Sequence, residues 1–214
     1  IQILIDQISF VQSEITEDSE EEENGQEGPG IVTLDALMNG DFEESVFDRP
    51  VEGWSLATTN SAGSYDTSRD FTGNYLLSIT EDAYAGEKAL ALSGKKGTQG
   101  YVVAQSECIK VTPGTDYSFS YALKIQNVEI DQFYGGKVLV YQFDANGNLL
   151  EKKQVSDDLK ENINWTSFTS AITVKENAAY VRLGFYIGGV WQKNADIQIL
   201  IDQISFVQSE ITED

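Results

Sequence analysis

The chain has 214 residues, of which 41% are hydrophobic, and a formal net charge of −21 at neutral pH. This excess of carboxylates disfavours binding to nucleic acid or to an anionic membrane surface, and no apolar run approaches the ~18 residues that a membrane-spanning helix needs. The sequence has no histidine and one cysteine, Cys108, which excludes a Ser-His-Asp triad, an imidazole-bound metal and an internal disulfide. The length predicts one well-packed domain.

The two ends of the chain are identical in sequence: residues 1–18 recur without a change at 197–214. Recurrence at a fixed spacing is typical of tandem repeats, so we interpret residues 1–18 as the closing strand of a preceding module or as a duplicated segment. Two strands of identical sequence would compete for the same position in one sheet. The first copy is therefore expected to be disordered, to add to a sheet edge, or to undergo strand exchange with a neighbouring copy.

An acidic linker follows at residues 19–30. It contains the run Glu20 to Glu23 and ends in Gly28-Pro29-Gly30. Like charges repel one another, and the segment offers almost nothing apolar to bury, so we expect an extended, solvated spacer. The remaining residues, 31–214, are predicted to form the module itself.

From residue 31 onward the pattern is that of β-strands. Residues 117–126 and 180–187 alternate large apolar with small or polar side chains, which predicts strands with one buried and one solvent-facing side. Further strands are predicted near 87–93, 101–111, 137–144, 166–174 and 197–207. Turn-forming segments separate them, and residues 151–162 have too few apolar positions for a packed helix. The sequence therefore predicts an all-β fold, an antiparallel jelly-roll β-sandwich.

Several segments also match a known group of modules in their order and spacing. They are Leu37-Met38-Asn39-Gly40-Asp41-Phe42-Glu43, Gly53-Trp54, Ala85-Gly86-Glu87-Lys88-Ala89-Leu90, Thr112-Pro113-Gly114-Thr115, Phe143-Asp144-Ala145-Asn146-Gly147, Trp165-Thr166-Ser167-Phe168 and Ile201-Asp202-Gln203-Ile204. Together they resemble carbohydrate-binding modules of the family 4/9 type, with families 16 and 22 similar, which share a galactose-binding-like jelly-roll. The resemblance covers residues 37–207. It implies a usually non-catalytic module of secreted bacterial enzymes that degrade polysaccharides.

The resemblance also implies a structural calcium ion that ties the first strand to the last. Its ligands, carried over by motif, are the carboxylates of Glu43 and Asp202, with backbone carbonyls of Gly40 and Lys88. A hard cation requires several oxygen ligands, and carboxylates from distant segments supply them. Glu43 and Asp202 could instead be ordinary surface carboxylates, but Asp202 lies within an apolar strand, where a buried carboxylate needs a partner.

Sugar binding requires aromatic rings that stack on pyranose C–H groups, with polar side chains around them for the hydroxyls. The aromatic candidates are Trp191, Trp54 and the loop residue Tyr134, which is expected to close the binding trough. Polar or amphipathic candidates on the solvent-facing sides of strands are Lys124, Gln126, Gln142, Arg182 and Tyr186. Small residues such as Ser120 and Gly184 would leave a shallow trough between them.

Each of these assignments has an ordinary structural alternative. Trp54 could fill the core, and Arg182 could pair with a neighbouring acid. Trp165, which precedes a strand, is expected to be a core residue. Cys108 lies beside Ile109 and is expected to be a buried, inert thiol.

The sequence therefore predicts an extracellular or cell-surface module of bacterial type that is not an enzyme. Its partner is a β-linked polysaccharide of the glucan, xylan or mannan type, and its role is to target an attached glycoside hydrolase. The first alternative is a calcium-stabilised structural or adhesive β-sandwich of a cell-surface protein. The second is a small glycanase that uses a carboxylate pair.

Overall fold

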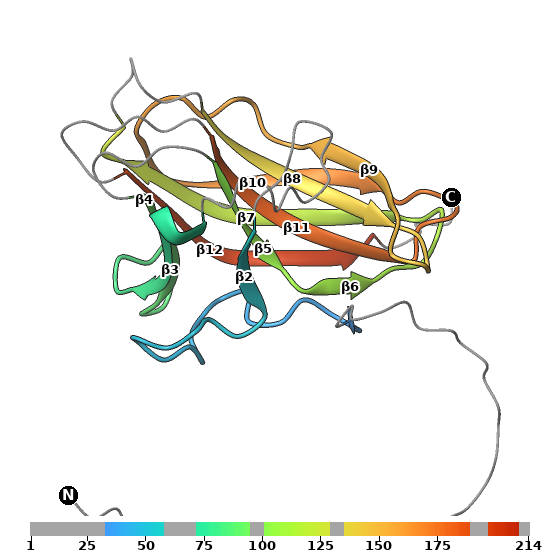
Figure 1. Cartoon of the computed structure of the whole chain (residues 1–214), viewed down its shortest axis with the longest axis horizontal. Helices are drawn as coiled ribbons and strands as arrows, with labels where there is room; N and C mark the ends of the chain where they lie inside the picture. The colour runs from blue at the N-terminus through green and yellow to red at the C-terminus, as the bar shows by residue number, and fades with distance from the viewer. Residues whose placement is uncertain (1–32, 58–71, 95–100, 129–134, 189–196, 210–214) are drawn as a thin grey trace, which may run out of the picture.

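A computed structural model describes residues 33–57, 72–94, 101–128, 135–188 and 197–209. These residues form two stacked β-sheets whose long strands run along the longest axis of the molecule (Figure 1). All strand pairs described are antiparallel except the short parallel pair of β1 and β6. The predicted antiparallel β-sandwich is thus confirmed. Across the described ranges, no helix is long and apolar enough to cross a membrane.

The larger sheet has seven strands and is built around β11 (Tyr180–Gly188). One side of β11 pairs with β8 (Gly135–Phe143), which in turn pairs with β9 (Leu149–Gln154). The other side pairs with β6 (Cys108–Lys110) and β5 (Val102–Ser106). The short strands β1 (Thr33–Leu34) and β2 (Trp54–Ala57) pair with β6 and β5.

The smaller sheet has five strands in the order β10, β7, β12, β4, β3. Their bounds are β10 (Ile163–Thr173), β7 (Asp116–Gln126), β12 (Ile197–Gln208), β4 (Ala89–Gly94) and β3 (Tyr75–Thr80). A single 3₁₀ turn, η2 (Thr72–Asn74), leads into β3 among the residues described.

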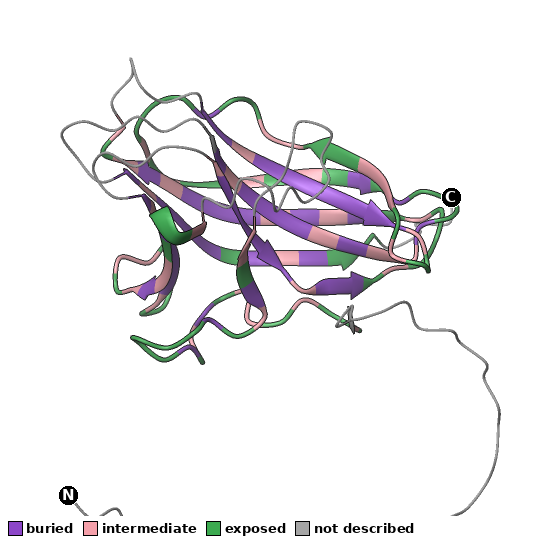
Figure 2. Cartoon of the chain, viewed as in Figure 1, coloured by how far each residue is buried: buried purple, intermediate pink, exposed green. Residues whose placement is uncertain are grey.

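The core lies between the sheets and follows the predicted alternation. In β7 the odd-numbered side chains from Tyr117 to Ile125 are buried, and in β11 the same holds from Val181 to Ile187. Figure 2 shows this alternation as purple and pink bands along the strands. Since successive side chains of a strand point to opposite faces, the even-numbered residues of β7 and β11 point out of the sandwich.

The closing strand β12 is central in the smaller sheet, where it pairs with β7 on one side and β4 on the other. Ile197, Ile199 and Ile201 contribute to the core before a register shift between Asp202 and Ser205. Gln203, within that irregularity, has a φ of 49°. The shift lets Ile204 and Phe206 return to the core side.

Some strand limits differ from the sequence prediction. The segment predicted as one strand at 101–111 is divided at Glu107, whose amide donates to the Gly53 carbonyl rather than to the sheet ladder. Part of the segment 151–162, which has too few apolar positions for a packed helix, belongs to the edge strand β9. The predicted closing strand of a preceding module (1–18), the linker (19–30), Tyr134 and Trp191 lie outside the described residues.

Candidate functional site

The sugar-binding residues predicted from the sequence do not share one surface. Lys124 and Gln126 lie on β7, in the smaller sheet, whereas Arg182 and Tyr186 lie on β11, in the larger sheet. Each pair points away from the core that lies between the two sheets. The expectation of one trough is therefore wrong, because period-two alternation assigns a side chain to a solvent-facing side without identifying the sheet.

We call the outer side of the larger sheet the tyrosine face. Cross-strand register places Tyr186 opposite Val103 and Lys137, and Arg182 opposite Tyr141. The face thus comprises Ser55, Tyr101, Val103, Gln105, Leu139, Tyr141, Arg182, Gly184 and Tyr186. Part of it forms an aliphatic and aromatic cluster of its own, separate from the main core.

Two tyrosine rings lie almost parallel on this face. The ring centroids of Tyr101 and Tyr186 are 6.2 Å apart with an angle of 27° between the planes, and both residues are half-buried. Burial raises the pKa of Tyr186, and the neighbouring Tyr101 raises it further. The Tyr186 phenol therefore stays neutral at physiological pH, where it can donate and accept a hydrogen bond.

Gly184 keeps the floor of the tyrosine face low. A Cβ atom at this position would lie 2.8 Å from Val103 Cγ1 and 2.9 Å from Tyr141 Cε2. The Tyr141 ring therefore lies over the backbone of β11, in the space that any other residue would fill. This arrangement makes the centre of the face flat and largely apolar.

Polar groups flank that floor. Gln105 Nε2 donates to Ser55 Oγ across β5 and β2 at 3.4 Å. The Arg182 guanidinium lies against the buried Cys108 thiol and partly offsets the rise that burial causes in the pKa of that thiol. Burial is the larger effect, which agrees with the inert thiol predicted from the sequence.

Two predicted contact residues are buried instead. Trp54 is 6% exposed, and its ring packs 5.8 Å from Phe42 and 6.1 Å from Phe185, measured between centroids. The position after a glycine had suggested an exposed ring, but β2 directs the indole into the core. Trp54 is thus a core residue, as the structural alternative predicted.

Gln142 is fully buried and shares the core-facing side of β8 with Val138 and Val140. Its amide donates to Glu151 Oε2 and to the Thr173 carbonyl, and its Oε1 accepts from the Lys175 backbone N–H. These bonds connect the two sheets. The flanking aromatic side chains, rather than Gln142, point outward, so the predicted role of Gln142 in sugar contact is wrong.

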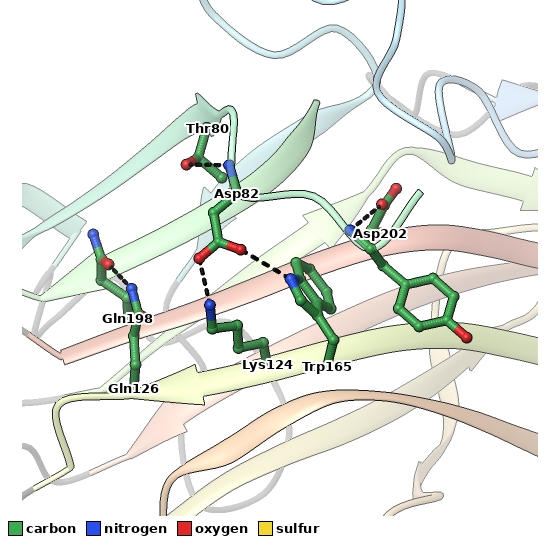
Figure 3. A network of polar contacts seen from close by, with 8 residues as sticks. Thr80, Asp82, Lys124, Gln126, Trp165, Gln198 and Asp202 are labelled. Carbon is green, nitrogen blue, oxygen red and sulfur yellow. Dashed lines mark hydrogen bonds and ion pairs between the residues drawn. The ribbon is translucent and has the colours of Figure 1, made fainter. Parts of the chain in front are cut away.

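We call the outer side of the smaller sheet the tryptophan face (Figure 3). Trp165 Nε1 donates to Asp82 Oδ1 at 3.0 Å, and Lys124 Nζ forms an ion pair with Asp82 Oδ2. The Tyr84 ring lies 6.0 Å from the Trp165 ring between centroids. Trp165 was expected to be a core residue, but it is half-buried on this outer side.

A second polar row runs along the same face. Gln126 Nε2 donates to Gln198 Oε1, and Gln198 Nε2 donates to Ser93 Oγ at 3.3 Å. These side chains come from the neighbouring strands β7, β12 and β4. The predicted solvent-facing positions of Lys124 and Gln126 are thus correct, although they belong to a different face from Arg182.

The predicted calcium ligands Glu43 and Asp202 come together at the register shift of β12. Asp202 is fully buried, and its carboxylate accepts from the backbone N–H groups of Tyr84, Ala85 and Gln203 at 2.7–3.0 Å. Burial raises the pKa of Asp202, and the nearby Glu43 carboxylate raises it as well. A buried carboxylate that is repelled by a second one nearby favours a cation between them.

Backbone groups lie close to the Glu43 carboxylate and fix its position. Glu43 Oε1 accepts from the backbone N–H groups of Glu87 and Lys88 at 2.9 and 3.1 Å. A Cβ atom at Gly86 would lie 2.2 Å from that same oxygen. The Gly40 carbonyl accepts from the Ile204 N–H at 2.8 Å, which leaves one of its lone pairs for a further partner.

The Lys88 side chain, rather than only its backbone carbonyl, makes contacts beside the predicted calcium position. Its Nζ donates to the backbone carbonyls of Glu43 and Ser45 at 2.6 and 2.8 Å. The described residues contain no cluster of three or more Asp, Glu, Cys or His side chains that could hold a metal. Two carboxylates fit a calcium ion only if backbone carbonyls and water complete the oxygen shell, which is common for this cation.

Several residues of both faces were not predicted. Tyr101 alternates with Val103 and Gln105, and this pattern could have placed it on the solvent-facing side of β5. Asp82 and Tyr84 lie between β3 and β4, in a segment without periodicity. Only the contact with Trp165 in the folded chain reveals their position.

No family model matches the sequence, and no curated protein matches it. Solved structures match over most of the chain. The arabinose-bound MgGH51 α-L-arabinofuranosidase has a TM-score of 0.57 at 16% identity, over 86% of this chain and 28% of that one. Tailspike protein 4 of bacteriophage CBA120 has a TM-score of 0.53 at 13% identity, over 82% of this chain and 21% of that one. The chain thus spans about a quarter of the length of these two proteins.

Two shorter proteins match over almost their whole length. A family 16 carbohydrate-binding module has a TM-score of 0.51 at 16% identity, and this chain covers 99% of it. TmCBM61 in complex with β-1,4-galactotriose has a TM-score of 0.50 at 13% identity, again with 99% covered. At these identities the likeness shows the fold alone. That fold is the jelly-roll of carbohydrate-binding modules, as predicted, and none of these four structures singles out the 4/9 type.

Proposed function

We propose that this chain is a non-catalytic carbohydrate-binding module and that its tyrosine face binds a polysaccharide. The observation that carries the proposal is the near-parallel pair of half-buried rings, Tyr101 and Tyr186, on the outer side of a sheet. The fold, shared with a family 16 module and with TmCBM61, supports the proposal.

The chemistry of this face suits a sugar polymer. Parallel aromatic rings offer flat apolar surfaces to the C–H groups of successive pyranose rings. The Arg182 guanidinium on the same face would supply directional hydrogen bonds to hydroxyl groups. Val103, Leu139 and Tyr141 on the floor are at most 3% exposed, so the half-buried rings of Tyr101 and Tyr186 would carry the contact with an extended sugar chain.

The substrate class proposed is a β-linked polysaccharide of the glucan, xylan or mannan type. Such modules increase the effective concentration of a tethered catalytic domain at its substrate. We therefore include in the proposal an attached glycoside hydrolase and an extracellular location. Arabinose binding by the arabinofuranosidase and galactotriose binding by TmCBM61 extend the set of sugars to test.

A structural calcium ion is the second part of the proposal. The Glu43 and Asp202 carboxylates would hold it, with carbonyl oxygens such as that of Gly40 completing the site. Bound there, the ion would neutralise the buried charge of Asp202 and join the segment before β2 to the closing strand. This role is one of stability, since a ligand that binds only the native state stabilises it.

Affinity electrophoresis on gels that contain xylan, mixed-linkage β-glucan, mannan or β-1,4-galactan tests the proposal. At least one polysaccharide should retard the wild-type chain, and Tyr186→Ala should weaken that retardation. Phe47→Ala is the matched control, because Phe47 is an aromatic residue 42% exposed outside both faces. Absence of retardation on every glycan, together with self-association, would favour the adhesive alternative. Release of reducing sugar would favour the glycanase.

A further inference from the structure

The aromatic pair on the tryptophan face has no role in the core. Tyr84 is 46% exposed and Trp165 is half-buried, and neither belongs to the core cluster or to the hydrophobic residues that pack against it. Each ring therefore keeps one apolar side available to a partner. Large aromatic side chains gain most of their stabilisation from burial, so packing alone does not account for this pair.

Polar contacts hold the indole in a fixed orientation. Asp82 accepts from Trp165 Nε1 through one carboxylate oxygen and from Lys124 Nζ through the other. Figure 3 shows Lys124 and Trp165 projecting from neighbouring strands toward Asp82, which belongs to the segment after β3. Because the ring cannot rotate freely, little conformational entropy is lost when a ligand stacks on it.

The charges around the rings indicate the kind of ligand. Asp82 and Lys124 neutralise each other, and the neighbouring Gln126, Gln198 and Ser93 carry no charge. Such a surface offers amide and hydroxyl groups beside an aromatic ring, and the charge of Asp82 is matched by that of Lys124. A neutral sugar fits this combination better than a peptide or an acidic polymer does.

We propose that the tryptophan face is a second glycan-binding site, separate from the tyrosine face and on the opposite side of the sandwich. The Trp165 ring stacks on a neutral sugar residue, and Tyr84 contacts the same residue from the side, since the two ring planes lie at 55°. The Lys124 ammonium and the Gln126 amide provide hydrogen bonds to its hydroxyls. The inference rests on the proposed function for its ligand class.

Two sites on opposite faces allow a function that a single site does not. A single module can hold two polysaccharide chains at once and so cross-link them. The alternative is a purely structural role, in which Asp82 fastens the segment after β3 to β7 and β10. The ion pair of Asp82 and Lys124 is partly exposed and contributes modestly to stability, and this role gives the exposed ring of Tyr84 no function.

Isothermal titration calorimetry of the full chain with the hexasaccharide of the glycan that retards it tests the inference. The wild-type chain should bind two oligosaccharides, Trp165→Ala one, Tyr186→Ala one and the double variant none. Trp165→Phe should keep two sites, because it retains a ring without the bond to Asp82. The melting temperature of each variant shows that it is folded.

A second readout measures cross-linking through the turbidity of a soluble long-chain polysaccharide mixed with the protein. Only chains with both faces intact should raise it. The wild type could instead bind one oligosaccharide, at a site that Tyr186→Ala removes and Trp165→Ala leaves unchanged. That result would overturn the second site and support the proposed function. Binding that neither substitution affects, or no binding of any glycan, would overturn the inference as well.

Discussion

Replacing Trp54 by alanine tests whether this residue belongs to the core or to a binding surface. The side chain is 6% exposed and contacts the rings of Phe42 and Phe185. Aromatic residues bury roughly 150–250 Å² each, which at about 25 cal/mol per Å² corresponds to about 4–6 kcal/mol. Measured Trp→Ala substitutions in cores cost about 3–5 kcal/mol, so the expected loss of unfolding free energy is about 4 kcal/mol.

Thermal unfolding by circular dichroism, together with urea titration, provides the measurement. A domain of this size loses roughly 2–4 °C of melting temperature per kcal/mol, so Trp54→Ala should melt about 8–16 °C lower than the wild type. The variant should keep its glycan affinity at temperatures where it is folded. Trp165→Ala is the control and should lose well under half as much stability. A Trp54→Ala variant with near-normal stability and lost affinity would refute the burial argument.

The remaining predictions concern the calcium position. Chelation by EDTA should lower the melting temperature of the wild type measured by calorimetry, but not that of Asp202→Asn; equal responses of the two would argue against the site. Calcium affinity should fall as the pH decreases, because the raised pKa of Asp202 brings protonation into competition with the ion. In the metal-free protein, stability should change with pH in the opposite direction to calcium affinity. The pKa of Asp202 is higher in the folded than in the unfolded state, so the wild type should lose stability relative to Asp202→Asn as the pH rises between these two pKa values. Urea unfolding at a series of pH values measures this, and a difference that stays constant with pH would contradict it. Gly86→Ala should cost about 1–2 kcal/mol or more, because Gly86 has a φ of +72° and its Cβ would collide with Glu43. Gly73→Ala, where nothing lies within 4 Å of the new Cβ, is the control for urea unfolding.

The sequence predicts the long strands well because their large apolar residues alternate with small or polar ones. β7 and β11 each bury the side that carries these large residues against the same core. The strands that were missed, β1, β2, β3 and β9, are short or at sheet edges. Edge strands such as β9 place lysines where a central strand places apolar residues, so they lack the pattern that reveals a strand.

The candidate site was harder to predict than the fold, for a geometric reason. Alternation correctly showed that Lys124 and Arg182 leave the core, but only the pairing of strands shows that they leave it in opposite directions. The same limit explains Gln142, a polar residue on the core-facing side whose three hydrogen bonds lie within the folded chain. The proximity of Glu43 to Asp202, in contrast, followed from the resemblance of two separated motifs.

The central claim is that a polysaccharide binds to the outer side of the larger sheet, and NMR titration of the ¹⁵N-labelled chain tests it most directly. On addition of the oligosaccharide identified by affinity electrophoresis, the amide signals of Val103, Gln105, Arg182 and Tyr186 should shift and saturate together. If these signals stay in place at saturating ligand, the tyrosine face is not the binding surface.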